Sequence, residues 1–264
     1  MSGGKITAYL DCVSPFSYFA LKHLEKHRPV LESYNVEIDI VPVFLGGIME
    51  GSGNKPPWTL KAKASYSGPD SARAKRYFGV PKMQTPSFFP ILSLLPQRAL
   101  VYIKVTYPEL FVQTFLDLFC AMWEENQDVS KPNLLSVALS KRFEEVQIRE
   151  ILDKATAPEC KQALNAKTKE ALEQGAFGCP WFWVRNFKGE EEPFFGSDRY
   201  VCLFSVGSYL HVSSMVPGGD SGRMRNETRP LRKEADPGRF HFMWQHLDLA
   251  WKDVELLPPP QAKI

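Results

Sequence analysis

A strand, a helix and a second strand follow one another near the start of this chain, and they restrict its fold more than any other feature of the sequence. Lys5 to Leu10 form an apolar run that predicts a buried strand. Ser17 to about Glu32 predict a helix interrupted by Pro29 near its end. Val36 to Leu45 alternate at period two and predict another strand. Because this order is a βαβ unit, we expect the two strands to be parallel and joined by a right-handed crossover.

The rest of the chain is predicted to be mainly helical and then to return to strands. The stretch GGIMEGSGNKPPW, residues 46–58, is rich in Gly and Pro and is predicted to be a loop. Helical patterns are strongest at Pro108 to Asn126 and Phe143 to Asp153, whereas Cys179 to Val184 and Glu191 to Gly196 predict a hairpin. The order gives an α/β chain with a final helix, divided into residues 1–45, a helical block 46–175, and residues 176–264.

Composition and charge argue against several classes of function. The 32 basic and 30 acidic residues leave a net charge of +2 without a basic cluster, so we expect no nucleic-acid partner. No apolar run reaches the ~18 residues of a membrane span and no signal peptide is recognisable, so we expect a soluble intracellular protein. The cysteines are odd in number and lack C-x-x-C spacing, and His23 and His27 are expected on a solvated helix face. No metal site is therefore predicted.

Five separated segments carry a resemblance to a known family. They are DCVSPFSY, GGIMEGSGNKPPW, AKASY followed by RYFGVPKM, GAFGCPWFWV and FFGSDR, in this order within residues 6–199. Together they resemble the kappa-class glutathione transferases and their bacterial relatives, the 2-hydroxychromene-2-carboxylate isomerases. The resemblance implies a thioredoxin-like fold with an inserted all-helical domain, as in DsbA. It also implies glutathione as co-substrate, a hydrophobic electrophile as second substrate, and a homodimer.

The stretch Ser14-Pro15-Phe16-Ser17 lies where the first strand gives way to the first helix. Redox enzymes of the thioredoxin fold place C-x-x-C there, because a helix N-terminus stabilises a thiolate. With oxygen in place of both sulfurs, disulfide exchange at this position is chemically impossible. The resemblance implies that Ser14 instead donates a hydrogen bond to the thiolate of glutathione. An ordinary N-cap serine followed by proline is the alternative, and Ser14 can serve as both.

The resemblance also implies which residues bind glutathione. Besides Ser14, the matching positions are Pro15, Phe16, Asn54, Lys63, Cys179, Pro180, Ser197 and Asp198. Pro180 is expected to be cis, so that the backbone of Cys179 pairs with the tripeptide like an added strand. Ser197 and Asp198 are expected to begin the last helix. A turn asparagine, a solvated lysine and plain helix caps are the alternatives for Asn54, Lys63 and this last pair.

The apolar wall of a second-substrate site has three candidates among the aromatic residues. They are Phe16, Trp58 and Trp181, each with burial in the core as the alternative.

Residues 200–239 interrupt the resemblance, because the segments on either side of them read as continuous family sequence. We hypothesise that they are a translated retained intron, with a genuine surface insertion as the alternative; a comparison of transcript with genomic DNA distinguishes the two. The final Ala262-Lys263-Ile264 resembles a three-residue peroxisomal address. Since the family is associated with peroxisomes and mitochondria, both compartments are candidates.

Three other functions stay open from the sequence. A glutathione-dependent isomerase would use the same thiolate, which adds to an unsaturated ring substrate and later leaves. A thiol-disulfide oxidoreductase of DsbA type would normally need a cysteine at position 14 or 17, so here it would depend on Cys12 or Cys179 alone. The third alternative is a non-catalytic binding module that keeps the fold.

Overall fold

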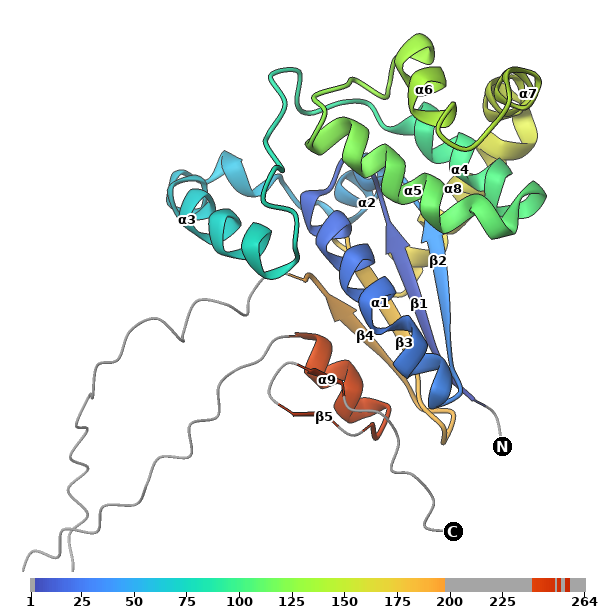
Figure 1. The fold of residues 1–264 in the computed structure, drawn as a ribbon. Helices are drawn as coiled ribbons and strands as arrows, with labels where there is room; N and C mark the ends of the chain where they lie inside the picture. Colours follow the sequence, from blue (N-terminus) through green and yellow to red (C-terminus); the bar gives the residue numbers. More distant parts are fainter. Residues whose placement is uncertain (1–2, 198–238, 250, 253–254, 257–264) are drawn as a thin grey trace, which may run out of the picture.

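The computed structural model describes residues 3–197, 239–249, 251–252 and 255–256. Four strands form one mixed sheet in the order β2-β1-β3-β4 (Figure 1). β1 (Gly4–Leu10) is parallel to β2 (Val36–Pro42) and antiparallel to β3 (Trp181–Arg185), which forms a hairpin with β4 (Glu191–Phe195). The parallel βαβ unit and the hairpin predicted from the sequence are confirmed. β2 ends before Leu45, because that residue begins a helix.

The helix α1 (Pro15–Ser33) joins β1 to β2 and covers one face of the sheet (Figure 1). Phe19, Leu21 and Leu24 of its apolar stripe are fully buried. The predicted interruption at Pro29 is wrong, since the helix continues to Ser33. Pro29 is exposed and Leu31 beyond it is fully buried, so packing of the last turn compensates for the missing backbone hydrogen bond.

The expectation of a solvated His23 and His27 is also wrong. Each is only 5% exposed, and their rings lie 4.4 Å apart. Trp244 of α9 (Arg239–His246) packs within 6.3 Å of one ring and 6.1 Å of the other. A segment distant in the sequence therefore covers this side of α1, and the burial holds the pKa of His23 well below its ordinary value.

Helices occupy most of the chain between β2 and β3, and α4 to α8 gather beyond the carboxyl ends of β1 and β2 (Figure 1). The helices expected from Pro108 and from Phe143 are observed as α5 and α7, while the domain limits at residues 45 and 175 stay a prediction. The elements are α2 (Leu45–Ser52), η1 (Pro57–Thr59), α3 (Lys61–Tyr77), α4 (Leu94–Thr106), α5 (Pro108–Trp123), α6 (Pro132–Leu139), α7 (Glu145–Thr156) and α8 (Pro158–Glu173).

The prediction of a loop over residues 46–58 is wrong, because α2 and the short helix η1 occupy most of it. Two of the glycines allow close packing against α8 rather than a turn. A Cβ on Gly51 would lie 2.7 Å from Leu172 Cδ1, and one on Gly47 would lie 3.2 Å from Thr168 Cγ2. Only Gly53, at φ 71°, ends the helix in the left-handed conformation that glycine favours.

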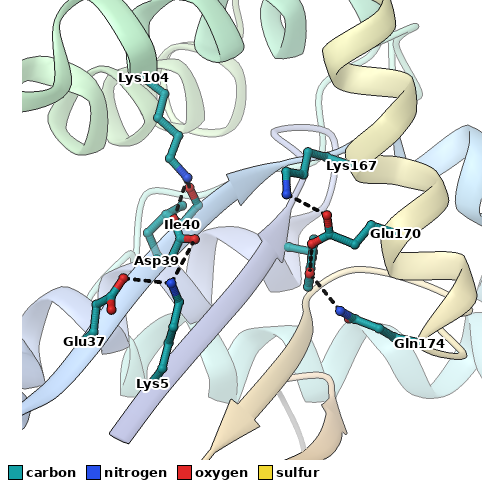
Figure 2. A network of polar contacts seen from close by, with 9 residues as sticks. Lys5, Glu37, Asp39, Ile40, Lys104, Lys167, Glu170 and Gln174 are labelled. Atoms are coloured by element: carbon teal, nitrogen blue, oxygen red, sulfur yellow. Dashed lines mark hydrogen bonds and ion pairs between the residues drawn. The ribbon is translucent and has the colours of Figure 1, made fainter. Parts of the chain in front are cut away.

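Helices cover both faces of the sheet and are tied to it by polar contacts as well as by the core. Figure 2 shows Lys104 of α4 beside Asp39 of β2, at 2.5 Å between Nζ and Oδ1. The Tyr9 hydroxyl of β1 donates to Glu170 of α8 at 2.5 Å and accepts from Gln174 at 3.0 Å. Burial and the Glu170 carboxylate both raise the pKa of Tyr9, so this hydroxyl stays protonated at neutral pH.

Candidate functional site

The turn between β1 and α1 places Ser14 at the N-cap of α1, as the sequence predicts. The Ser14 Oγ accepts a hydrogen bond from the Ser17 amide at 3.2 Å, and Pro15 occupies the first helical position. The same hydroxyl donates to the carbonyl of Cys179 at 3.0 Å. Ser14 is only 2% exposed. Its hydroxyl therefore joins the start of α1 to the segment that leads into β3.

The Cys179–Pro180 peptide bond is cis, which confirms the expectation for Pro180. The carbonyl of Pro180 accepts from the Gly196 amide at 3.1 Å, which fixes the bend before β3 against the end of β4. The Cys179 carbonyl faces Ser14, as the bond between them requires. The Cys179–Pro180 backbone is therefore held by Ser14 through the carbonyl of Cys179 and by Gly196 through the carbonyl of Pro180.

Ser197 reaches the same region from the end of β4. Its side chain is fully buried, and its hydroxyl donates to the Phe16 carbonyl in the first turn of α1 at 2.7 Å. Ser197 lies in a bend, and Asp198 lies outside the described residues, as do residues 200–238. The structure therefore brings together Ser14, Pro15, Phe16, Cys179, Pro180 and Ser197.

Asn54 is not part of this cluster, but it contacts a residue close to Cys179 in the chain. Its Nδ2 donates to the Phe177 carbonyl at 2.6 Å, and its Oδ1 accepts from the Lys55 amide at 2.8 Å. Asn54 thereby connects the loop after α2 to the segment that carries Cys179. Lys63 is exposed on α3, and no contact among the described residues joins it to Ser14, Cys179 or Ser197.

The three candidates for an apolar wall have different environments. Trp181 is 5% exposed and belongs to the core formed with Tyr9 and Ile48. Trp58 is 48% exposed, and its ring packs edge-on against Phe89 at 5.2 Å. Phe16 is partly buried and packs against Phe19 at 6.2 Å. Trp58 and Phe16 thus remain candidates for contact with a ligand, whereas Trp181 is core.

Sequence reasoning missed the residues that hold the turn around Ser14 in place. Gln97 of α4 is fully buried, and its Nε2 donates to the carbonyls of Leu10 and Val43 at 2.8 Å each. Its Oε1 accepts from the Cys12 amide at 3.3 Å, and Trp123 Nε1 donates to the Cys12 carbonyl at 2.9 Å. Nothing in the sequence pattern marks a glutamine inside an apolar helix for this task.

Asp11 was missed as well, although it adjoins the motif. Its carboxylate is fully buried and accepts from the Val13 amide at 3.0 Å, the Leu45 amide at 2.8 Å and the Ser93 hydroxyl at 2.7 Å. Its carbonyl accepts from the Ser14 amide at 3.0 Å. Burial raises the pKa of Asp11 to about 6, against the effect of these donors.

The thiols near Ser14 are protonated at neutral pH. Cys12 and Cys179 are buried, and burial together with the Asp11 charge raises the pKa of each well above its ordinary value. The pKa of Cys120 is raised to about 11, chiefly by burial. None of these side chains has the electropositive, accessible surroundings of a reactive cysteine.

We therefore expect iodoacetamide to modify Cys12 and Cys179 at least about 100-fold more slowly in the native chain than in the urea-unfolded chain, because thiolate content and access control the reaction. Peptide mapping by mass spectrometry resolves each cysteine separately. Rapid modification of native Cys179 at neutral pH would favour the oxidoreductase alternative.

Metal ligation and membrane insertion find no support within the described ranges. No group of three or more His, Cys, Asp or Glu side chains there could hold a metal ion. No helix among the described residues is both long and apolar enough to span a membrane.

Comparisons with known proteins define the family to which these features belong. The model of the DsbA-like thioredoxin domain family matches residues 5–204, so the chain belongs to that family. It is similar to glutathione S-transferase kappa 1 of Homo sapiens, at 28% identity over 75% of this chain and 88% of the human protein. The protein of the same name from Rattus norvegicus is 28% identical over 74% of this chain and 87% of its own length.

A solved structure of a 2-hydroxychromene-2-carboxylate isomerase has the same fold, with a TM-score of 0.59 at 21% identity over 73% of this chain and 88% of that chain. The thioredoxin-like fold with inserted helices and the resemblance to the kappa class, both predicted from the sequence, are confirmed.

Proposed function

We propose that this protein is a glutathione transferase of the kappa type, in which Ser14 stabilises the glutathione thiolate. The observation that carries the proposal is the 3.0 Å hydrogen bond from Ser14 Oγ to the Cys179 carbonyl. It places a hydroxyl at the start of α1 beside a backbone segment that could pair with a peptide. The names of the curated relatives support glutathione as co-substrate.

Glutathione binding would exchange one hydrogen bond for another at this point. The amide of the cysteine in glutathione would donate to the Cys179 carbonyl, as a β-strand partner does. The Ser14 hydroxyl, released from that carbonyl, would then rotate toward the glutathione sulfur. Its oxygen would still accept from the Ser17 amide, and that bond strengthens the hydroxyl as a donor.

One hydroxyl donor and a helix N-terminus together can stabilise the thiolate enough to lower the pKa of the glutathione thiol by ~2 units. Lowering the pKa of a thiol by ~2 units from ~8.5 needs ~2.7 kcal/mol of preferential interaction with the anion. A hydroxyl donor to a charged acceptor contributes roughly 1.5–3 kcal/mol, and a helix N-terminus adds ~0.3–1 kcal/mol. The thiolate then attacks an electrophilic carbon of a hydrophobic second substrate. The new C–S bond forms as the leaving group departs with its electron pair, and the thiol proton is released to solvent.

The remaining site residues are proposals of the same kind. We infer that Pro15, Phe16, Pro180 and Ser197 line the site, that Asn54 holds the neighbouring loop, and that Lys63 and Asp198 meet the two ends of the tripeptide. A glutathione-dependent isomerase is the second candidate, supported by the fold shared with the solved isomerase. The oxidoreductase alternative lacks a cysteine at position 14 or 17 and an accessible thiolate elsewhere in the described residues.

The division into domains, the oligomeric state and the location in the cell are inferred from the resemblance alone. We infer that residues 46–175 are a helical domain inserted into a thioredoxin-like domain. We infer further that the protein forms a homodimer and resides in peroxisomes or mitochondria, with the cytoplasm as the alternative. Sedimentation and imaging of a tagged chain test assembly and location.

Calorimetric titration of glutathione tests the central proposal. We expect saturable binding by the full chain or, if residues 200–239 block the site, by a version that lacks them. Binding by both makes the segment a tolerated insertion, and binding by the shortened chain alone supports a retained intron. Absence of binding by both folded proteins contradicts the glutathione transferase. S-methylglutathione is the matched probe, because it keeps the peptide and removes the ionisable thiol.

A further inference from the structure

The buried carboxylate of Asp11 has no cation to balance it among the described residues. It forms no ion pair there, and its side chain is 0% exposed. Burying an unpaired charge is expensive, and chains keep one mainly where its position or its titration has a function. Three of its donors come from different places: the Ser14 turn, the first residue of α2, and Ser93 at the start of α4.

Asp11 is also the residue from which the Ser14 turn is built. Its carbonyl accepts from the Ser14 amide at 3.0 Å, and its own amide donates to Ser17 Oγ at 3.4 Å. Ser14 Oγ in turn contacts Cys179. Two successive contacts thus separate Asp11 from the backbone where the glutathione sulfur would lie.

The charge of Asp11 acts on the thiols next to the Ser14 turn. It contributes to the raised pKa of the Cys179 thiol on one side and of the Cys12 thiol on the other. Both thiols are protonated, and therefore uncharged, at neutral pH. The groups that face it from α2 and from the start of α4 are the Leu45 amide and the Ser93 hydroxyl, both uncharged.

We propose that Asp11 is a positioning residue of the glutathione site. Its carboxylate ties the Ser14 turn to α2 and α4, and its charge opposes the ionisation of the bound thiol. The inference rests on the proposed glutathione function and adds a regulation to it. When Asp11 is ionised, its negative charge opposes the ionisation of the bound thiol. When Asp11 is protonated, that repulsion is absent and the thiolate forms more readily. The two groups therefore titrate as a coupled pair.

Asp11→Asn separates this role from a purely structural one. The amide keeps the size of the side chain and one acceptor, but it removes the charge. We expect the ultraviolet absorbance of the bound thiolate to titrate about 0.5–1 pH unit lower in D11N than in the wild type. We also expect weaker binding of S-methylglutathione, because an amide nitrogen accepts no hydrogen bond: whichever carboxylate oxygen it replaces, either the Val13 amide or the Leu45 amide and the Ser93 hydroxyl lose their acceptor. Weaker binding with an unchanged titration overturns the electrostatic half of the proposal.

Asp128→Asn is the matched control, since Asp128 also accepts from a backbone amide and a serine hydroxyl, both of Ser130, outside the site. It should leave the thiolate titration unchanged. Wild-type protein that fails to bind glutathione contradicts the proposed function. Wild-type protein that binds while D11N both titrates and binds S-methylglutathione identically contradicts only the role of Asp11.

Unfolding without glutathione gives a second measurement. The pKa of folded Asp11, about 6, lies above the ~3.9 of an unfolded aspartate, so the folded state binds this proton more tightly. The associated stability is present at low pH and is lost as the pH rises through about 6. The urea midpoint of the wild type should therefore rise relative to that of D11N as the pH falls from about 7 to about 5. Parallel midpoints would overturn the assignment of this titration to Asp11. If D11N does not fold, Ser93→Ala replaces it: it keeps the charge, removes one donor, and should move the same pH dependence upward.

Discussion

Replacing Ser14 with alanine is expected to lower kcat/KM for glutathione conjugation about 10- to 100-fold at neutral pH. The change removes one hydrogen bond to a developed thiolate, and such a bond contributes roughly 1.5–3 kcal/mol. The loss should shrink as the pH rises, because the bound thiol of the variant would ionise closer to its ordinary pKa of ~8.5. A pH–rate profile with an activated aryl halide measures both effects. A uniform loss at every pH would instead assign Ser14 to folding or binding.

Ser17→Ala is the matched control for this experiment. Ser17 is fully buried in the same Ser-Pro-Phe-Ser stretch, but its hydroxyl accepts from the Asp11 amide and makes no described contact with Cys179. Its loss should change kcat/KM by less than about threefold, since a neutral and long hydrogen bond contributes little. Equal losses in the two variants would contradict a specific role for the Ser14 hydroxyl. The binding of S-methylglutathione should be nearly unchanged in Ser14→Ala, because that ligand has no thiolate to stabilise.

The strands and the first helix were predictable because their apolar periods are set by local geometry. Two examples are the alternation at Val36 to Val41 and the helical repeat at Tyr18, Leu21 and Leu24. Each pattern reflects burial of one face of its own strand or helix and does not depend on how the rest of the chain folds. The sequence prediction fails at α2, because the Gly and Pro content of residues 46–58, Gly51 included, indicates a loop. A glycine required for close approach of two helices and one required for a positive φ are identical in a sequence. Only the contact with Leu172 distinguishes them.

The prediction that His23 and His27 lie on a solvated helix face failed for a related reason. A helix face is solvated only if no later segment covers it, and α9 begins beyond residue 238. In the candidate site, too, residues whose roles depend on local sequence were predictable, and residues whose roles depend on distant contacts were not. Ser14 and Pro180 belong to short motifs, so the sequence indicated them. Gln97 has its role only through contacts with residues far away in the chain, and Asp11 has its role partly through such contacts, with Leu45 and Ser93. No spacing rule marks contacts of this kind.

Gln97→Leu is expected to lower the free energy of unfolding by about 3 kcal/mol, a large effect for one substitution. Leucine fills a similar volume but offers no hydrogen bond. The Cys12 amide and the Val43 carbonyl would lose the partners that now lie at 3.3 and 2.8 Å. Each buried backbone group left unsatisfied costs about 1–3 kcal/mol. The Leu10 carbonyl would suffer less, because it also accepts from the Val43 amide at 3.1 Å. Denaturant unfolding measures the loss.

Gln162→Leu on the exposed face of α8 is the control, and it should change stability by less than about 0.5 kcal/mol. The comparison also connects stability to function. Because Gln97 bonds Leu10 and Cys12, which lead into the Ser14 turn, and ties them to Val43, its loss should weaken glutathione binding even at temperatures where the variant is fully folded. A stable Gln97→Leu protein with unchanged affinity would mean that the turn keeps its shape without this side chain. Asp11 and Trp123 would then be the residues that hold Ser14 opposite Cys179.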